Sequence, residues 1–256
     1  MILFVDIGNT RIKWARYKHD ALDIYEGCNY SNNKAKLSKI LKENWNEFYS
    51  VERILVSNAA SKEMGAIITN YCLKHWEGNP EFLSSQKNTL GLTCGYEKFN
   101  KLGVDRWLSM LGAWSLHQDK EVANGFCVID CGTFVTVDAV DVDGGHLGGL
   151  ITPGLEMLQN ISADHLSLRT DSFSDYFWDQ KKSLLATNTG SAVFAGSYYM
   201  VVSFIENIIN ELNNEMKDCT IYFTGGDADA FSHLLNEEVV YHPNLVFEGM
   251  LALVKE

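Results

Sequence analysis

Two short segments of the sequence each combine an acid, a glycine and a threonine within a few residues. Residues 6–13 read Asp-Ile-Gly-Asn-Thr-Arg-Ile-Lys, and residues 130–133 read Asp-Cys-Gly-Thr. A glycine lets the backbone approach a ligand closely, and the threonine and backbone N–H groups of such a turn can donate to phosphate oxygens. A carboxylate at the end of a strand can hold Mg²⁺ through water, because this ion keeps several waters and takes few protein ligands. Both segments therefore predict phosphate chemistry.

Each turn also has a simpler interpretation as a β-hairpin, because Asn and Gly are common in hairpin turns. The repetition of the same residue types in both halves of the chain favours a nucleotide site over two unrelated hairpins. Thr224-Gly225-Gly226-Asp227 adds a glycine pair at an expected strand-to-helix junction, which suits close passage of a nucleotide. No GxxxxGK[ST] segment and no GxGxxG fingerprint following a strand occurs, which disfavours the nucleotide folds that use them.

Asp105 and Arg106 open an expected helix over residues 103–117. An acid in the first turn of a helix is explained by the helix dipole alone. It is explained equally well as a base that orients and deprotonates a substrate hydroxyl, with Arg106 recognising a charge on the substrate or phosphate. The pattern alone leaves both interpretations open.

Short apolar runs predict the strands that position the two turns. Residues 2–6 and 126–130 each end in the carboxylate, and alternating segments predict further strands at 11–17, 53–57, 134–140, 146–151 and 220–224. Helical spacing predicts helices over 34–48, 61–74, 191–212 and 246–254, and residues 88–101 are expected to form a loop. Because the two halves begin alike, we expect an internal repeat of two similar α/β lobes, 1–118 and 119–256, with a ligand site between them.

Composition narrows the class of protein. The net charge of −12 argues against nucleic-acid binding, although it does not exclude an anionic substrate. No signal peptide and no apolar run long enough to cross a membrane is expected, which predicts a cytoplasmic protein. The six cysteines form no CxxC pair, the histidines have no metal-binding spacing, and Cys127 and Cys131 are expected to face the interior.

The ordered set of motifs resembles type III pantothenate kinases, also called the CoaX or Bvg accessory factor family. The motifs in this set are Asp-x-Gly-Asn-Thr-x-x-Lys at 6–13, Gly-x-Asp-Arg at 103–106, Asp-x-Gly-Thr at 130–133, Gly-Gly-x-Ile-x-Pro-Gly at 148–154, Asn-Thr at 188–189 and Gly-Gly-Asp at 225–227. The resemblance implies the actin-like ATPase fold (acetate and sugar kinase/Hsp70/actin) with two ribonuclease H-like lobes, and a homodimer. It implies phosphorylation of pantothenate by ATP, the first step of coenzyme A biosynthesis.

The resemblance also implies roles for particular residues. Asp105 matches the proton acceptor, and Asp130 matches the ligand of a monovalent cation, K⁺ or NH₄⁺. Asp6 would hold Mg²⁺ through water. The matches to pantothenate contacts are Tyr96, Gly103, Val104, Asp105, Arg106 and Thr189, the last of which helps to close the pocket near the dimer interface in the family. The matches to ATP contacts are Asp6, Ile7, Gly8, Asn9, Thr10, Arg11, Ile12, Lys13 and Thr133.

Two departures from the family pattern bear on these sites. Phe99 stands where the family often has proline, three residues after the tyrosine, and Phe134-Val135 stand where small residues or threonines are usual. Two other functions stay open at this stage. One is a kinase for a different hydroxy acid on the same fold, and the other is a regulatory accessory factor or an actin-like assembly protein without catalysis.

Overall fold

The computed structural model describes residues 1–31, 33–118, 124–166, 184–217, 219–233, 235 and 238–255. Contacts divide the chain into two compact units. The first comprises Met1–Val122, Gly144–His146 and Asn244–Glu256, and the second comprises Ala123–Asp143 and Leu147–Pro243. The expected halves, 1–118 and 119–256, differ from these units in where they place residues 144–146 and the C-terminal segment.

The first unit contains a five-stranded sheet with the order β3-β2-β1-β4-β5. Strand β1 runs antiparallel to β2 and parallel to β4, β2 and β3 are antiparallel, and β4 and β5 are parallel. The strands are β1 (Ile2–Ile7), β2 (Arg11–Lys18), β3 (Ala21–Asn29), β4 (Arg53–Asn58) and β5 (Glu81–Phe82). A small antiparallel hairpin of β6 (Asn88–Thr89) and β7 (Leu92–Thr93) and the 3-10 helix η1 (Phe99–Lys101) follow.

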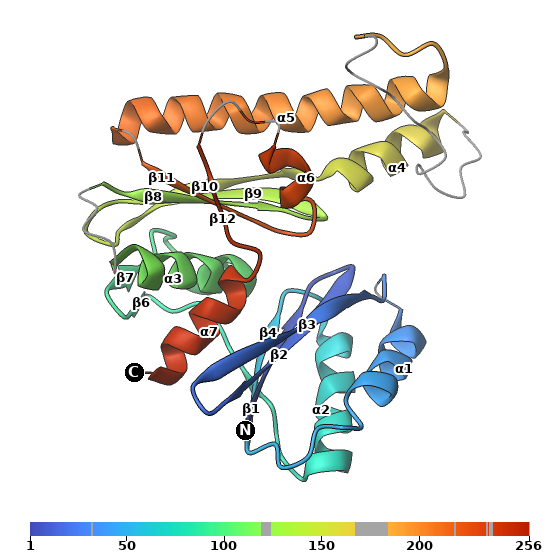
Figure 1. Ribbon diagram of the computed structural model, residues 1–256, viewed down its shortest axis with the longest axis vertical. Coiled ribbons are helices and arrows are strands. Elements are labelled where there is room, and N and C mark those ends of the chain that lie inside the picture. Colours follow the sequence, from blue (N-terminus) through green and yellow to red (C-terminus); the bar gives the residue numbers. More distant parts are fainter. Residues whose placement is uncertain are drawn as a thin grey trace. The chain divides into compact units, whose positions relative to one another are not determined.

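Helices cover both faces of this sheet (Figure 1). One face packs on α1 (Lys34–Asn44) and α2 (Lys62–Trp76), and the other packs on α3 (Val104–Gln118) and α7 (Leu245–Lys255). The strand period of two explains the division, because Leu3, Val5 and Ile7 join the α1/α2 cluster while Phe4 joins the α3/α7 cluster. Glycines at 112 and 249 let α3 and α7 approach closely, since a Cβ at either would collide with the backbone of the other helix.

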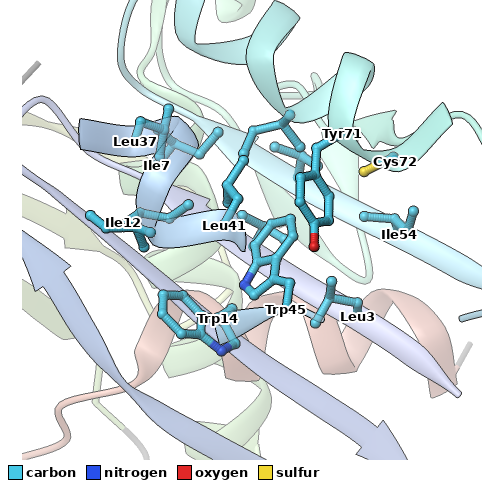
Figure 2. Close-up of a cluster of buried hydrophobic side chains, with 14 of the residues drawn as sticks. Leu3, Ile7, Ile12, Trp14, Leu37, Leu41, Trp45, Ile54, Tyr71 and Cys72 are labelled. Carbon is cyan, nitrogen blue, oxygen red and sulfur yellow. The ribbon is translucent and has the colours of Figure 1, made fainter. Parts of the chain in front are cut away.

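Aromatic rings fill the α1/α2 face (Figure 2). The Trp45 ring meets Trp14 and Tyr71 edge to face, with centroids 6.0 Å and 5.6 Å away. Such pairs contribute about 0.5–1.5 kcal/mol each beyond the area they bury. Ile7 and Ile12, which flank the β1–β2 turn, belong to the same cluster, so this packing supports the turn.

The second unit repeats the topology of the first. Its sheet has the order β10-β9-β8-β11-β12, with β8 antiparallel to β9 and parallel to β11, and β11 parallel to β12. Helix α5 lies along one face of this sheet (Figure 1), and its Val201, Ile205 and Ile209 pack on the strands. The elements are β8 (Phe126–Cys131), β9 (Phe134–Val140), β10 (His146–Pro153), α4 (Leu155–His165), α5 (Thr189–Met216), β11 (Thr220–Thr224), α6 (Ala228–Ser232) and β12 (Val240–Tyr241). The expected internal repeat and the actin-like fold class with two ribonuclease H-like lobes are confirmed.

Most elements expected from apolar periodicity are present, including α3 with Trp107, Leu108 and Leu111 buried. Cys127 and Cys131 are buried, as expected. Strand β3 was not expected, and the expected loop at 88–101 contains the β6–β7 hairpin and η1. These pieces are two or three residues long apart from β3, too short for a periodic pattern to reveal them.

The expectation that no apolar segment is long enough to cross a membrane is wrong by length and composition. Helix α5 has 28 residues and a mean hydropathy of 1.4 over its most apolar window. One such helix is weak evidence for a membrane span, because core helices pass the same test. One face of α5 is the core of the second unit, although only 28% of that window is buried.

Candidate functional site

Asp6 lies near the end of β1, where the strand places it on a defined face of the sheet. It is in register with Lys13 on β2 and with Ser57 on β4. Phe4, two residues earlier, packs on Leu108 of α3, so the side chain of Asp6 is directed to the same face. The strand pairing thus brings a carboxylate, an ammonium group and a hydroxyl to one edge of the first unit.

The carboxyl group of Asp6 is enclosed, although the residue as a whole is half-buried. Its Oδ1 has almost no exposed surface and no hydrogen-bond partner among the described residues. The pKa of Asp6 is raised from 3.8 to about 6, mainly by burial and then by the charge of Asp105, while the Ser57 hydroxyl and the charge of Lys13 act in the opposite direction. Two carboxylates of different elements therefore interact at this edge.

The turn after β1 is closed by backbone contacts. The N–H of Gly8 donates to the carbonyl oxygen of Arg11 at 3.0 Å. Ile7 and Ile12 are fully buried, so only their backbone groups remain for a ligand, whereas Asn9 is exposed. Gly8, Thr10 and Lys13 are half-buried, and Arg11 is exposed.

Tyr30 supports this turn and was not singled out in the sequence. Its hydroxyl donates to the carbonyl oxygen of Gly8, and its backbone N–H donates to that of Thr10 at 2.9 Å. The ring is fully buried, and burial raises the pKa of the hydroxyl to about 12. No local motif marks this residue, because its partners lie some twenty residues earlier in the chain.

Asp105 lies in the first turn of α3, and its carboxylate folds back over Gly103. Its Oδ1 accepts the N–H of Arg106 at 2.9 Å, as the helix-cap interpretation expects. The same carboxylate raises the pKa of Asp6, which the cap interpretation does not require. A Cβ at Gly103 would lie 2.5 Å from Asp105 Oδ1, so the glycine leaves room for this position of the carboxylate.

Arg106 and Tyr96 are joined beside Asp105. Arg106 is buried, its Nη1 donates to the Tyr96 hydroxyl at 3.1 Å, and its guanidinium carbon lies 5.7 Å from the centroid of the Tyr96 ring. Val104 is half-buried and packs against the α3/α7 cluster. The structure thus brings together Asp6, Lys13, Tyr96, Gly103, Val104, Asp105 and Arg106 in the first unit.

The second turn occupies the same topological position in the second unit. Asp130 is in register with Thr136 and Thr224, and the N–H of Gly132 donates to the carbonyl oxygen of Phe134 at 3.0 Å. Two glycines pack closely against this turn. A Cβ at Gly154 would lie 2.0 Å from the Gly132 oxygen, and one at Gly225, which has φ +105°, would lie 2.5 Å from Asp130 Oδ1.

A second carboxylate lies near Asp130. The N–H of Asp227 donates to the carbonyl oxygen of Cys131 at 2.9 Å. Burial, followed by the charges of Asp130 and Asp227, raises the pKa of the Cys131 thiol. Thr133, the expected ATP contact, is half-buried, and its carbonyl oxygen accepts the N–H of Gly154 at 2.9 Å.

The two departures from the family pattern have structural explanations. Val135 is buried in the core beneath α5, so only Phe134, with 39% exposure, borders the second turn. Phe99 begins η1, where the N–H of Leu102 donates to the Phe99 carbonyl oxygen at 3.1 Å. Hydrogen bonds of a helical turn thus hold residues 98–102, where the family often has a proline.

Thr189 lies apart from these groups in the sequence and opens α5. The Asn188 side chain caps that helix by accepting the N–H of Ser191 at 2.8 Å, while the Thr189 side chain is exposed. Capping alone therefore explains the asparagine of this pair. It does not explain the threonine.

Comparison with known proteins agrees with this arrangement. Residues 2–211 match the family model described as type III pantothenate kinase. The chain belongs to the type III pantothenate kinase family. The type III pantothenate kinase of Nitrosococcus oceani is 35% identical over 257 residues, covering 100% of this chain and 94% of that protein. The enzyme of the same name from Dichelobacter nodosus is also 35% identical, over 260 residues, covering 98% of this chain and 97% of that protein.

A solved structure of a Baf-family protein from Campylobacter jejuni has the same fold, with a TM-score of 0.57 at 22% identity, covering 99% of this chain and 97% of that one. As a member of this family on an actin-like fold, the chain is an ATP-binding kinase.

The first turn offers a fit for a divalent cation. The described residues contain no group of three or more His, Cys, Asp or Glu side chains that could hold a metal ion. Mg²⁺ does not need such a group, because waters and substrate phosphates fill most of its coordination sphere. The unpartnered Asp6 Oδ1 and the neighbouring Asp105 charge are the features that a cation would satisfy.

We predict that Asp6→Asn stabilises the protein in the absence of nucleotide and metal. The folded-state pKa of about 6 lies above the ordinary 3.8, so ionisation of Asp6 opposes folding as pH rises through that window. Above pH 6 the neutral amide is expected to raise the free energy of unfolding by at most about 3 kcal/mol. Urea unfolding in EDTA at several pH values tests this. The advantage should shrink toward pH 4, and a variant no more stable than wild type at pH 8 contradicts it.

We predict that Gly103→Ala impairs turnover without unfolding the protein. The new methyl group would displace the Asp105 carboxylate, whose Oδ1 would lie 2.5 Å away, while the nearest Arg106 atom would lie at an ordinary 3.9 Å. Misplacing a catalytic group by about 1 Å can cost ~10²-fold, so we expect kcat to fall roughly 10- to 100-fold. Gly78→Ala is the control, because its Cβ would meet only the Trp76 oxygen, at 3.8 Å. If the Gly103→Ala variant has the melting temperature of wild type and an unchanged kcat, the role given to this glycine is contradicted.

Proposed function

We propose that this chain phosphorylates pantothenate to 4′-phosphopantothenate with ATP, as its family membership indicates, and that Asp105 accepts the proton of the acceptor hydroxyl. The observation that carries the assignment is the cluster of Asp105, Arg106 and Tyr96 at the start of α3, a helix that packs on the face of the sheet toward which Asp6 is directed. It connects the expected substrate residues with the expected phosphate turn.

The reaction is an in-line displacement. The primary hydroxyl oxygen of pantothenate forms a bond to the γ-phosphorus as the bond to the β–γ bridging oxygen breaks, ADP leaves, and the hydroxyl proton passes to Asp105. The transition state is loose, so positioning and charge neutralisation contribute more than the strength of the base. Lys13 and the backbone N–H groups of residues 6–13, together with Thr133, would hold the phosphates.

Arg106 and Tyr96 would bind the carboxylate end of pantothenate. Guanidinium and hydroxyl groups donate to carboxylates, and a buried guanidinium gains more from such a pair than an exposed one. The backbone of Gly103 and Val104 would line the same site. Thr189, exposed at the start of α5, would complete it in the assembled protein.

Two cations fit the carboxylates described above. Asp6 would hold Mg²⁺ through water, and Asp130 would bind K⁺ or NH₄⁺, with Asp227 nearby adding negative charge. When bound, these ions neutralise charge that develops on the transferred phosphoryl group and on ADP.

A homodimer accounts for the largely unburied apolar face of α5. Met200 on this helix is 62% exposed, and Ile161 on α4 is 48% exposed. Covering these side chains with a second copy would place the exposed Thr189 close to an interface. We also propose a cytoplasmic protein that binds neither nucleic acid nor membranes, which the net charge of −12 supports for nucleic acid.

The assay that tests the function is coupled ADP release with and without pantothenate, repeated with and without K⁺. ADP release is expected to require pantothenate and to rise with K⁺. Equal release without an acceptor would indicate an ATPase, filament formation with ATP and no turnover would indicate an assembly protein, and a higher kcat/KM for another hydroxy acid would indicate a different kinase.

We predict that Asp105→Asn retains ATP binding and loses most turnover. The amide keeps an acceptor for the Arg106 N–H but cannot take a proton, and such groups contribute typically 10²–10⁴-fold. We expect kcat to fall by roughly 10²-fold or more, with the ATP dissociation constant, measured by calorimetry, little changed. A kcat comparable with that of wild type would remove Asp105 from this role.

A further inference from the structure

A three-residue segment from the middle of the second half of the sequence belongs to the first unit. Gly144–His146 is grouped with residues 1–122 by contacts, although β9 before it and β10, which begins at His146, belong to the sheet of the second unit. The segment is tied to the β6–β7 hairpin. The N–H of Thr93 donates to the carbonyl oxygen of Gly144 at 2.8 Å, and Thr93 forms an isolated parallel bridge with Gly145.

The fit of this segment leaves little freedom. Gly144 has φ +82°, and a Cβ there would lie 2.6 Å from the Gly91 oxygen and 3.0 Å from the Trp114 ring. A Cβ at Gly95 would lie 1.9 Å from the carbonyl oxygen of His146. Two glycines are therefore needed for the segment to lie against residues 88–101, the loop that carries Tyr96 and is called the substrate loop below.

His146 makes two distinct contacts with that loop. Its ring stacks on Tyr96, with centroids 5.7 Å apart and planes 18° from parallel, and its Nδ1 accepts the N–H of Gly95 at 3.4 Å. The residue is 4% exposed.

Tyr96 thus contacts His146 through its ring and Arg106 through its ring and hydroxyl. Arg106 is the neighbour of Asp105 on α3, so the His146 ring is two contacts away from Arg106 and three from the residue proposed to accept the proton. We propose that His146 is a positioning residue for pantothenate, which fixes the Tyr96 ring and the Gly95 backbone so that Tyr96 and Arg106 are held ready for the substrate. The inference rests on the proposed role of Tyr96.

The geometry predicts a selective kinetic effect. Loss of His146 should release the Tyr96 ring and weaken pantothenate binding, while the Asp6 turn keeps its own supports in Tyr30 and β2. Outer-shell partners of a functional group typically contribute 10–100-fold, so we expect His146→Ala to raise the pantothenate KM roughly 10-fold. The KM for ATP should change less than about 2-fold, which is a split that general destabilisation would not produce.

Two conservative variants separate the two contacts. His146→Phe keeps a ring to stack on Tyr96 and loses the acceptor for Gly95, whereas His146→Asn keeps an acceptor on the short side chain and loses the ring. Each should raise the pantothenate KM less than His146→Ala, and both keep the proposal testable if the alanine variant does not fold. His75→Ala is the matched control, because His75 stacks on Tyr71 in the same unit, at 4.2 Å and 20°, and should leave both KM values unchanged.

The experiment measures both KM values and kcat for wild type, the His146 variants, His75→Ala, Tyr96→Ala and the double variant His146→Ala/Tyr96→Ala. If His146 acts through Tyr96, the double variant should resemble Tyr96→Ala alone. Multiplied effects in the double variant, equal rises in both KM values, or an unchanged pantothenate KM in folded His146 variants would each overturn the inference. An unchanged pantothenate KM in Tyr96→Ala would overturn the proposed substrate site and this inference together, whereas an effect of Tyr96→Ala without one of His146→Ala would overturn the inference alone.

Discussion

The interaction on which the candidate site depends is between two carboxylates that have the same charge. Asp6 is held by the register of β1 with β2 and β4, and Asp105 is held by the first turn of α3. Both elements are fixed by apolar packing on the same face of the sheet, through Phe4 and Leu108 among others. The pKa of Asp6 is raised mainly because the carboxyl group is buried, and the like charge of Asp105 adds to the effect. Apolar packing therefore holds the two carboxylates in positions that their mutual repulsion opposes.

The repeated topology shows how one framework serves two purposes. Asp6 and Asp130 occupy equivalent positions on β1 and β8, each before a turn closed by a glycine N–H. The first turn has Lys13 in register with its acid, while the second has Thr136 there and is pressed by Gly154 and Gly225. Lys13 lies beside Asp6, whereas Asp227 lies near Asp130, and this difference in charge suits different ligands at the two turns. The repeated topology places an acid near the end of an equivalent strand in each unit, and the neighbouring residues give each acid a different environment.

The parts of the site that follow from local sequence were predictable. A strand that ends in an acid, the glycine turn after it and Asp105 at the start of a helix each lie within a few residues of one another. Tyr30, Gly103 over the Asp105 carboxylate, and His146 beneath Tyr96 were not, although Gly103 was already expected near the substrate. The Gly95–His146 contact spans 51 residues, and it depends on a segment that leaves the sheet of the second unit to join the first. Periodicity predicts which face of an element is buried but not which distant segment covers it. For the same reason the sequence placed α7 with the second half.

The residues that support the substrate loop lie at the start of β10, and the residue after that strand supports the second turn. His146 stacks on Tyr96, and Gly154 donates its N–H to the Thr133 carbonyl oxygen. Strand β10 joins these two supports, and it is the edge strand beside β9 in the sheet of the second unit. A side chain at residue 95 would collide with the His146 carbonyl oxygen, and one at residue 154 would collide with the Gly132 carbonyl oxygen. A glycine therefore permits the close backbone contact at each end of β10.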